Sequence, residues 1–503
     1  MPFQPVTNPN PAVPPDPSQG IWEKFILAFE LEFVRVGSYF IPMTPRLLLL
    51  PASLLLGSCM LGPDFKLPDA SGGTHWKESR NVSSSRLPDA WWKLFGDSKL
   101  NQLVERSLAA NNDLAAAKAR VETARALVGL DRARLFPTLD LSTSAGIDRA
   151  SGNVVTNPAA QLKNQDYRSS FRLAYDPDLW GRNKRLLEGA TAQAVASAAL
   201  FDAQRLGLAT EVARQYFVLR GLDAQEAIVQ DTLVSRKEAL DLQKTKTDAG
   251  LTDGLATSRA RTELELANND LAIVQRQRGS AEHALAVLCG SRPSDFAVPA
   301  KVPGQALPNI RAELPAAVLF RRPDVRAAEQ QLRAANANIG VAEAAFYPSF
   351  NLLGAAGIAS LHTSDFLAWE SRVLSLGANA VMPVFDAGAN KSKLAAARST
   401  YDEALATYRQ TLLVALREVE DALVDLKGFA RSRSALEAAL ASSKDTRQLS
   451  QERYTEGLTS YLDVVDADRT VLQTRLSISL VDAQQRITLA ALAKALGGGW
   501  SGK

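Results

Sequence analysis

Two stretches of this chain repeat one another, and this duplication constrains the fold more than any single motif. Asn112-Asp113-Leu114 opens a helical run that closes at Phe136-Pro137. Pro323-Asp324-Val325 opens a second run that closes at Tyr347-Pro348, at a constant offset of 211 (323 − 112). Long internal repeats of one supersecondary unit indicate a ring, a solenoid or a barrel.

Beyond these prolines the correspondence continues at an offset of 207. Gly181 matches Gly388 (388 − 181 = 207), and Gly250-Leu251-Thr252 matches Gly457-Leu458-Thr459. Each copy has the pattern of a helix, a strand, a loop, a strand and a very long helical hairpin. We therefore predict a first repeat at 98–290, a linker at 291–315 and a second repeat at 316–500.

The first 58 residues have the features of a targeting region. Arg46, a short apolar run and small residues precede Cys59, as in a secretory signal. The run is shorter than the roughly 20 apolar residues of a transmembrane helix. Leu56-Gly57-Ser58-Cys59 resembles a bacterial lipobox, whose cysteine is acylated and becomes the mature N-terminus. Met60 follows in place of Asp, which favours sorting to the outer membrane.

Residues 43–58 supply a complete lipoprotein signal, so 1–42 are predicted to be an over-long start or an extension removed with it. The mature chain then covers 59–503, with a lipid-anchored tether at 59–97. The weak net charge of +3 gives no reason to expect nucleic-acid binding. Cys289 is the only other cysteine, so no intramolecular disulfide is expected, and its apolar neighbours predict a buried thiol.

Alternating sequence predicts four strands, at about 137–149, 166–177, 348–360 and 371–384. In the first, Leu139 and Leu141 share a face opposite Asp140; in the last, Leu376 is opposite Ser375. Such runs of about 10 residues are typical of transmembrane β-strands, although soluble antiparallel sheets alternate too. Four strands cannot close a barrel, because the smallest single-chain barrels have about eight, and an open edge in lipid leaves backbone groups unsatisfied. Either the hairpins lie outside the membrane or several chains share one barrel.

The strongest pattern belongs to the helices. No proline occurs between Arg182 and Arg292, or from Val384 to the C-terminus. Ten apolar residues from Leu394 to Leu426 recur at a mean spacing of (426 − 394)/9, about 3.6, which is the helical period. A run of some 65 residues would be roughly 100 Å long. Helices of this length must align against neighbouring helices or other chains.

An ordered set of motifs resembles the TolC-type outer-membrane efflux proteins, and within them the OprM- and NodT-like lipoprotein branch. The set spans essentially all of the mature chain. In chain order the motifs are Cys59 with Gly62-Pro63-Asp64-Phe65, Arg321-Arg322-Pro323-Asp324-Val325 with Ala327-Ala328-Glu329, Phe346-Tyr347-Pro348, Tyr454-Thr455-Glu456-Gly457, Leu462-Asp463-Val464-Val465-Asp466-Ala467 and Ala495-Leu496-Gly497-Gly498-Gly499-Trp500.

This resemblance implies a mostly α chain with a small transmembrane β part. Three copies would give four strands each to one 12-stranded outer-membrane barrel, and their long helices would form a periplasmic α-helical barrel. The resemblance implies a passive exit duct of a tripartite RND-type efflux system for drugs or other small molecules. Its partners would be a periplasmic adaptor protein and an inner-membrane pump.

Catalysis has little support in the sequence. The three histidines, His75, His283 and His362, have no metal-binding or nucleophile partner at motif spacing. We therefore expect no enzyme activity, no metal site and no cofactor other than covalent lipid on Cys59.

The resemblance points to one other site, the turn between the last two long helices. Asp463 and Asp466 are three residues apart and share a helix face there. In the family, matching aspartates surround the narrow periplasmic end of the tube, although an ordinary solvated helix face has the same pattern. The first repeat has Ala256 and Arg259 at these places, so Asp253 is its acidic candidate. We expect Arg259 to pair with an aspartate of the other hairpin, while Thr459 replaces an arginine found in some relatives.

Two other functions are compatible with the same sequence. One is the exit duct of a type I protein secretion system, which would share the architecture. The other is a lipid-tethered periplasmic scaffold without a channel, whose hairpins form an ordinary sheet. Detergent-resistant trimers and pore conductance separate the channel from the scaffold.

Overall fold

The computed structural model describes residues 60–68, 75–78, 87–149, 151, 153, 163–302, 304, 307–308, 310 and 321–499. The predicted signal region and Cys59 lie outside these residues, as do 311–320 of the linker and Trp500. The described chain is mostly helical and contains one four-stranded antiparallel sheet in the order β1-β2-β3-β4. The predicted class, a mostly α duplicated chain with a small β part, is confirmed.

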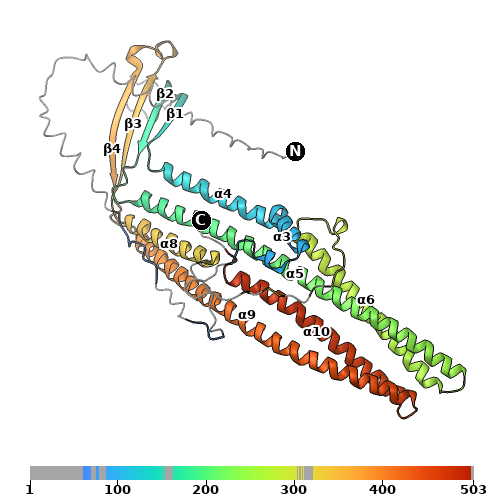
Figure 1. Cartoon of the computed structure of the whole chain (residues 1–503). Helices are drawn as coiled ribbons and strands as arrows, with labels where there is room; N and C mark the ends of the chain where they lie inside the picture. Colours follow the sequence, from blue (N-terminus) through green and yellow to red (C-terminus); the bar gives the residue numbers. More distant parts are fainter. Residues whose placement is uncertain are drawn as a thin grey trace, which may run out of the picture. The chain divides into compact units, whose positions relative to one another are not determined.

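Both repeats contain the same series of elements (Figure 1). In each, a 22-residue helix leads into a strand pair, and a 67-residue helix then pairs with a 35-residue helix. The short 3-10 helix η1 (Trp91–Phe95) lies in the segment predicted as the tether. The first repeat consists of α3 (Ser98–Ala110), α4 (Asn112–Ala133), β1 (Thr138–Arg149), β2 (Lys163–Tyr175), α5 (Arg182–Asp248) and α6 (Gly254–Leu288). The second consists of α8 (Pro323–Ala344), β3 (Ser349–Ser360), β4 (Arg372–Val381), α9 (Ala389–Thr455) and α10 (Tyr461–Ala495), with short 3-10 turns at Pro293–Asp295, Thr363–Asp365 and Trp369–Ser371.

The strand register aligns apolar side chains from all four strands in rows on one face of the sheet. Leu141 lies opposite Phe171, and Leu374 lies opposite Ala356, which itself pairs with Phe171. On the other face, Asp140 of β1 lies opposite Arg172 of β2. The same row of paired residues continues across the sheet to Ser375 of β4. The predicted division into an apolar and a polar face is therefore confirmed.

The strand ends differ from the predicted ones by up to three residues. β2 begins at Lys163 and ends at Tyr175, before Pro177, and β4 ends at Val381, before Pro383. Proline has no N–H for a ladder hydrogen bond, and it restricts the residue before it. This explains why the ladder stops before each proline.

The helical stripe predicted in the second repeat is the buried face of α9. Tyr408, Leu412 and Val419 are buried, and the other members of the stripe are half-buried. Tyr408 and Leu412 pack with Leu332 of α8, and Val419 belongs to the main core. Both long helices, at 67 residues and 1.5 Å per residue, are about 100 Å long.

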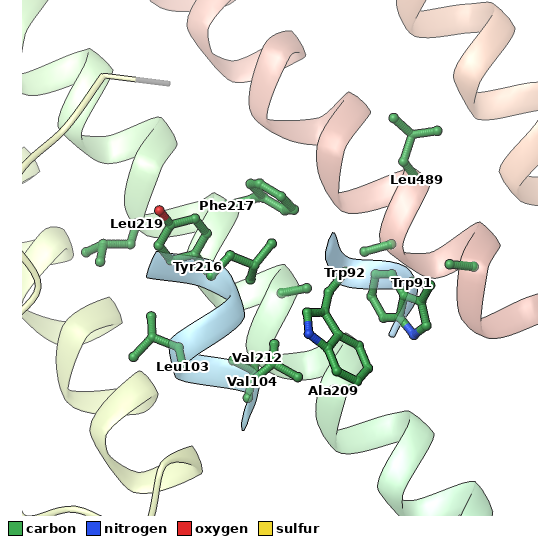
Figure 2. Close-up of a cluster of buried hydrophobic side chains, with 14 of the residues drawn as sticks. Trp91, Trp92, Leu103, Val104, Ala209, Val212, Tyr216, Phe217, Leu219 and Leu489 are labelled. Carbon is green, nitrogen blue, oxygen red and sulfur yellow. The ribbon is translucent and has the colours of Figure 1, made fainter. Parts of the chain in front are cut away.

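The main hydrophobic core lies where α3 and η1 cross the middle of α5 (Figure 2). Trp91 of η1, Val104 of α3 and Val212 of α5 are fully buried there. The side chain of Asp97 caps α3 by accepting from the N–H groups of Lys99 and Leu100, at 2.8 and 3.2 Å. The predicted buried thiol of Cys289 is confirmed, because its side chain is enclosed in the same core.

Within the part of the chain that the structure describes, no helix has the length and apolarity needed to cross a bilayer.

Candidate functional site: the tips of the two helical hairpins

The two helical hairpins end in turns of the same geometry. Gly250, after α5, and Gly457, after α9, have φ angles of +76° and +77°. These residues correspond at the offset of 207 that relates the repeats. A left-handed backbone conformation of this kind strongly favours glycine, so the turn chemistry is encoded twice in the chain.

Asp463 lies in the first turn of α10 and completes a capping box with Ser460. Its Oδ2 atom accepts hydrogen bonds from the backbone N–H and the hydroxyl of Ser460, at 3.1 and 3.0 Å, and from the hydroxyl of Thr459. The hydrogen bonds from Thr459 and Ser460 lower the pKa of the fully exposed Asp463. Asp463 therefore stabilises the helix start as well as placing a negative charge at the tip.

Asp466 lies one turn further along α10 and is also exposed. Its Oδ1 atom is 3.7 Å from Nη1 of Arg469. Val464, Val465 and Ala467 are buried, so the two aspartates project from the exposed side of α10. The structure thus brings Asp463 and Asp466 to one exposed surface beside the turn.

In the first hairpin Asp253 is the exposed residue that precedes α6, and its side chain does not cap the helix. Arg259 is half-buried on α6. Among the described residues it forms no ion pair with Asp463 or Asp466 within the single chain. The pairing of Arg259 with an aspartate of the other hairpin stays a prediction.

The two tips pack against each other through a small apolar cluster. Leu240 of α5 and Ala260 of α6 contact Tyr461 and Val465 of α10. At the edge of this cluster the hydroxyl of Tyr454 donates to Oε1 of the buried Gln243, at 2.8 Å. Burial raises the pKa of Tyr461, so its hydroxyl remains neutral at physiological pH.

A network of ion pairs joins all four hairpin helices immediately behind this cluster. The buried Arg236 of α5 lies 3.4 Å from Glu263 of α6 and 3.6 Å from Asp468 of α10. Arg469 of α10 contacts Glu263 at 2.5 Å, and Arg447 of α9 contacts Asp468 at 2.5 Å. Glu263 and Arg236 are both more than nine-tenths buried, so this network links the hairpins in a region of reduced screening.

Sequence reasoning found the exposed aspartates but missed this network. The residues that pair are on different helices, and Glu263 and Arg469 are 206 positions apart. The capping box had a visible signal, because a serine three residues before an acidic residue at a helix start is its usual form.

No group of three or more histidine, cysteine, aspartate or glutamate side chains is arranged to hold a metal ion, as far as the described ranges extend.

The sheet and the paired long hairpins are the architecture of solved outer-membrane channels. The chain aligns with the outer-membrane channel OprN with a TM-score of 0.81 and 31% identity, covering 88% of this chain and 100% of that one. It aligns with the CmeC outer membrane channel of Campylobacter jejuni with a TM-score of 0.79 and 25% identity, covering 88% of this chain and 96% of that one. The fold is therefore that of an outer-membrane channel protein.

The family follows from sequence comparison. The model of the outer membrane efflux protein family matches residues 103–291 and 314–498, so each match covers one repeat. The chain belongs to the outer membrane efflux protein family.

Its relatives include proteins that are named as parts of efflux pumps. The solvent efflux pump outer membrane protein SrpC of Pseudomonas putida is 33% identical over 460 residues, which are 90% of this chain and 97% of that protein. The outer membrane protein OprJ of Pseudomonas aeruginosa is 32% identical over 454 residues, which are 89% of this chain and 94% of that protein.

Proposed function

We propose that this protein is the outer-membrane exit duct of a tripartite efflux pump, formed by three copies of the chain. The observation that carries this proposal is the sheet. β1 and β4 each pair with a single neighbour, so among the described residues both edges of the sheet lack a partner strand. Leu376 and Leu374 on β4 are 86% and 75% exposed, although they lie on the apolar face.

An open sheet with an exposed apolar face is stable neither in water nor in lipid. In water the exposed leucines favour association, and in lipid each unpaired backbone group costs several kcal/mol. Pairing β4 of one copy with β1 of the next satisfies the open edges, and insertion of the closed barrel into a bilayer covers the apolar face with lipid. Three copies give 12 strands, which exceeds the minimum of about eight for a membrane barrel.

The polar face then lines the pore. Asp140 and Arg172 lie directly opposite each other, and Arg168 pairs with Asp166 at 2.9 Å. Both signs of charge are present, so this part of the duct has no strong ionic preference. A mixed lining suits an exit path for many small molecules, as the relatives named for solvent and antibiotic efflux pumps would require.

The narrow end of the duct lies at the hairpin tips in this proposal. Three copies would place six carboxylates, from Asp463 and Asp466, around one opening. Like charges at short range repel one another, and cations or arginines relieve that repulsion. The ion pairs of Glu263 hold the two hairpins of each chain together, so they oppose the separation of hairpins that a wider opening needs.

The remaining partners follow from the family. A periplasmic adaptor protein and an RND-type inner-membrane pump deliver the cargo to the hairpin end. Acylation of Cys59 anchors the mature chain to the outer membrane. A lipid-anchored chain could also act as a scaffold if its sheet did not enter the membrane. Conductance therefore decides between a channel and a scaffold.

Purified protein in a planar bilayer tests the proposal. We expect three-chain particles in detergent and discrete conductance steps after their insertion. Single chains that never conduct, with a soluble sheet, would favour the scaffold. Deletion of the gene should raise sensitivity to small apolar toxicants; loss of one secreted protein with unchanged sensitivity would favour a type I secretion duct.

The aperture needs a separate test, because Asp463 also caps a helix. Asp466→Asn removes one charge per chain without touching the capping box. We expect multivalent cations added from the periplasmic side to block the wild-type pore and to block Asp466→Asn several-fold less. Asp425→Asn, an exposed change on α9 about 30 residues before the turn, is the matched control. Equal block in all three proteins would remove Asp466 from the opening.

A further inference from the structure

The motif that follows the predicted lipidation site has no role in the duct, yet every residue of it makes a specific contact. The stretch Met60–Phe65 lies against two helices from different repeats, the start of α5 and the middle of α8. It has no regular secondary structure, and its contacts are made mainly through its backbone. A segment expected to be a plain tether is instead held in place.

Arg185 is the centre of this contact. Its side chain is only 2% exposed, although it carries a full charge. Nε donates to the carbonyl of Leu61 at 2.9 Å, and Nη2 donates to the carbonyl of Gly62 at 3.1 Å and to Oδ1 of Asp64 at 3.0 Å. Nη1 donates to Glu188 at 2.7 Å. A buried guanidinium with its donors distributed in this way has the geometry of a peptide-binding group.

The second repeat contributes the other side of the groove. The buried Asn336 of α8 donates to the carbonyl of Pro63 at 2.7 Å. Arg333 lies over the ring of Phe65, with 5.4 Å from Cζ to the ring centroid. The N–H of Leu61 donates to the carbonyl of Trp180 at 3.2 Å, which completes the attachment at the start of α5.

Two glycines make this close approach possible. Gly62 has a φ angle of +88°, and a Cβ there would lie 2.4 Å from Cα of Gly340. A Cβ on Gly340 would lie 2.7 Å from the carbonyl oxygen of Leu61. Gly129, which corresponds to Gly340 at the offset of 211, has no atom within 4 Å of such a Cβ. Among the described residues, this close backbone approach therefore occurs at Gly340 and not at the corresponding Gly129.

We propose that the groove between α5 and α8 is a binding site for the processed N-terminus of this same chain. Residues 60–65 are its ligand, and Arg185, Asn336 and Gly340 are its recognition residues. Docking joins the two repeats and replaces a loose tether by a fixed attachment.

Docking also fixes where the lipid enters the membrane, a point that rests on the proposed acylation of Cys59. Met60 packs on Gly181, at the start of α5 and six residues after the end of β2. Trp180 and Tyr347 pack together at the same level, with ring centroids 5.0 Å apart, as aromatic residues do at a membrane surface. The acyl chains thus enter the bilayer beside the base of the sheet.

Limited trypsin digestion of the detergent-purified full chain tests the docking. The exposed Lys66 directly follows the docked residues, and mass spectrometry measures cleavage between Lys66 and Leu67. Gly340→Ala leaves the cleaved segment unchanged but fills the groove. We expect cleavage to become about tenfold faster, because overpacking a close contact opens the site more often. Gly129→Ala, the corresponding change in the other repeat, should leave the rate unchanged.

A second pair of variants controls for a folding defect in the glycine variants. Arg185→Gln should also speed cleavage at Lys66, whereas Arg182→Gln, an exposed change one turn earlier on α5, should not. Palmitate labelling of all variants reports acylation separately from docking. Rapid cleavage of the wild-type chain at Lys66 would overturn the proposal. The proposal would also be overturned if Gly340→Ala were cleaved no faster than Gly129→Ala and Arg185→Gln no faster than Arg182→Gln. Missing label with slow wild-type cleavage would instead overturn only the acylation of Cys59.

Discussion

Replacing Leu376 by arginine tests the lipid-facing surface of the sheet. β4 has ten residues, which extend about 34 Å at 3.4 Å per residue. A strand tilt of roughly 40° reduces this height to about 25 Å, the height of the apolar band of an outer-membrane barrel. Leu376 is the fifth of the ten residues, so it lies close to the middle of the bilayer.

The expected cost of Leu376→Arg is about 2–4 kcal/mol per chain, or about 6–12 kcal/mol for three copies in one barrel. The adjacent Ser375→Arg places the same charge on the polar face and should cost little. Heat-resistant three-chain bands from outer-membrane extracts measure assembly. We expect a strong loss for Leu376→Arg and near-normal assembly for Ser375→Arg. Equal assembly of the two variants would mean that the apolar face does not contact lipid.

Three further predictions concern the anchor, the tip and the core. Cys59→Ser should abolish palmitate labelling and reduce outer-membrane recovery while trimers persist; normal labelling would contradict the lipobox. Glu263→Gln leaves the buried Arg236 with Asp468 as its remaining acidic partner, so it should cost at most about 3 kcal/mol and raise the resting conductance; an unchanged pore would contradict a locking role. Although burial raises it, hydrogen bonds from Tyr216 and from backbone N–H groups hold the pKa of Asp97 below its ordinary value. Stability from Asp97 is therefore present above about pH 4 and is lost as the pH falls through the lowered pKa. Asp97→Asn should therefore weaken the fall of the melting temperature at acid pH. The same dependence of melting temperature on pH in the variant and the wild type would refute this contribution.

The repeating features of the fold were predictable from sequence. Leu374 and Leu376 alternate with Ser375, and the stripe through Tyr408 and Leu412 has the helical period, because such patterns record which side of one element is buried. The strand ends were predicted less accurately, because Pro177 and Pro383 stop the ladder of hydrogen bonds a few residues before the predicted ends.

Contacts between distant elements were not predictable in the same way. Arg185 and Asp64 are 121 residues apart, and no periodicity relates a helix start to an extended segment. The network around Glu263 depends equally on how two hairpins are aligned. The exposed positions of Asp463 and Asp466 followed from spacing, but the capping function of Asp463 appeared only with the hydrogen bonds of Ser460.

Closure of the sheet between copies is the central claim, and disulfide scanning measures it most directly. In a Cys289→Ala background, one cysteine replaces Ser142 on β1, and a second is placed in turn at four positions of β4 that face the same side, Val373, Ser375, Gly377 and Asn379. Within one chain the two edge strands are three strand spacings apart, about 14 Å, whereas a disulfide requires Cα atoms about 4.4–6.8 Å apart. We predict that one register gives a ladder of linked chains that ends at three. Absence of links at every register, or a ladder that ends at another number, would contradict a barrel shared by three copies.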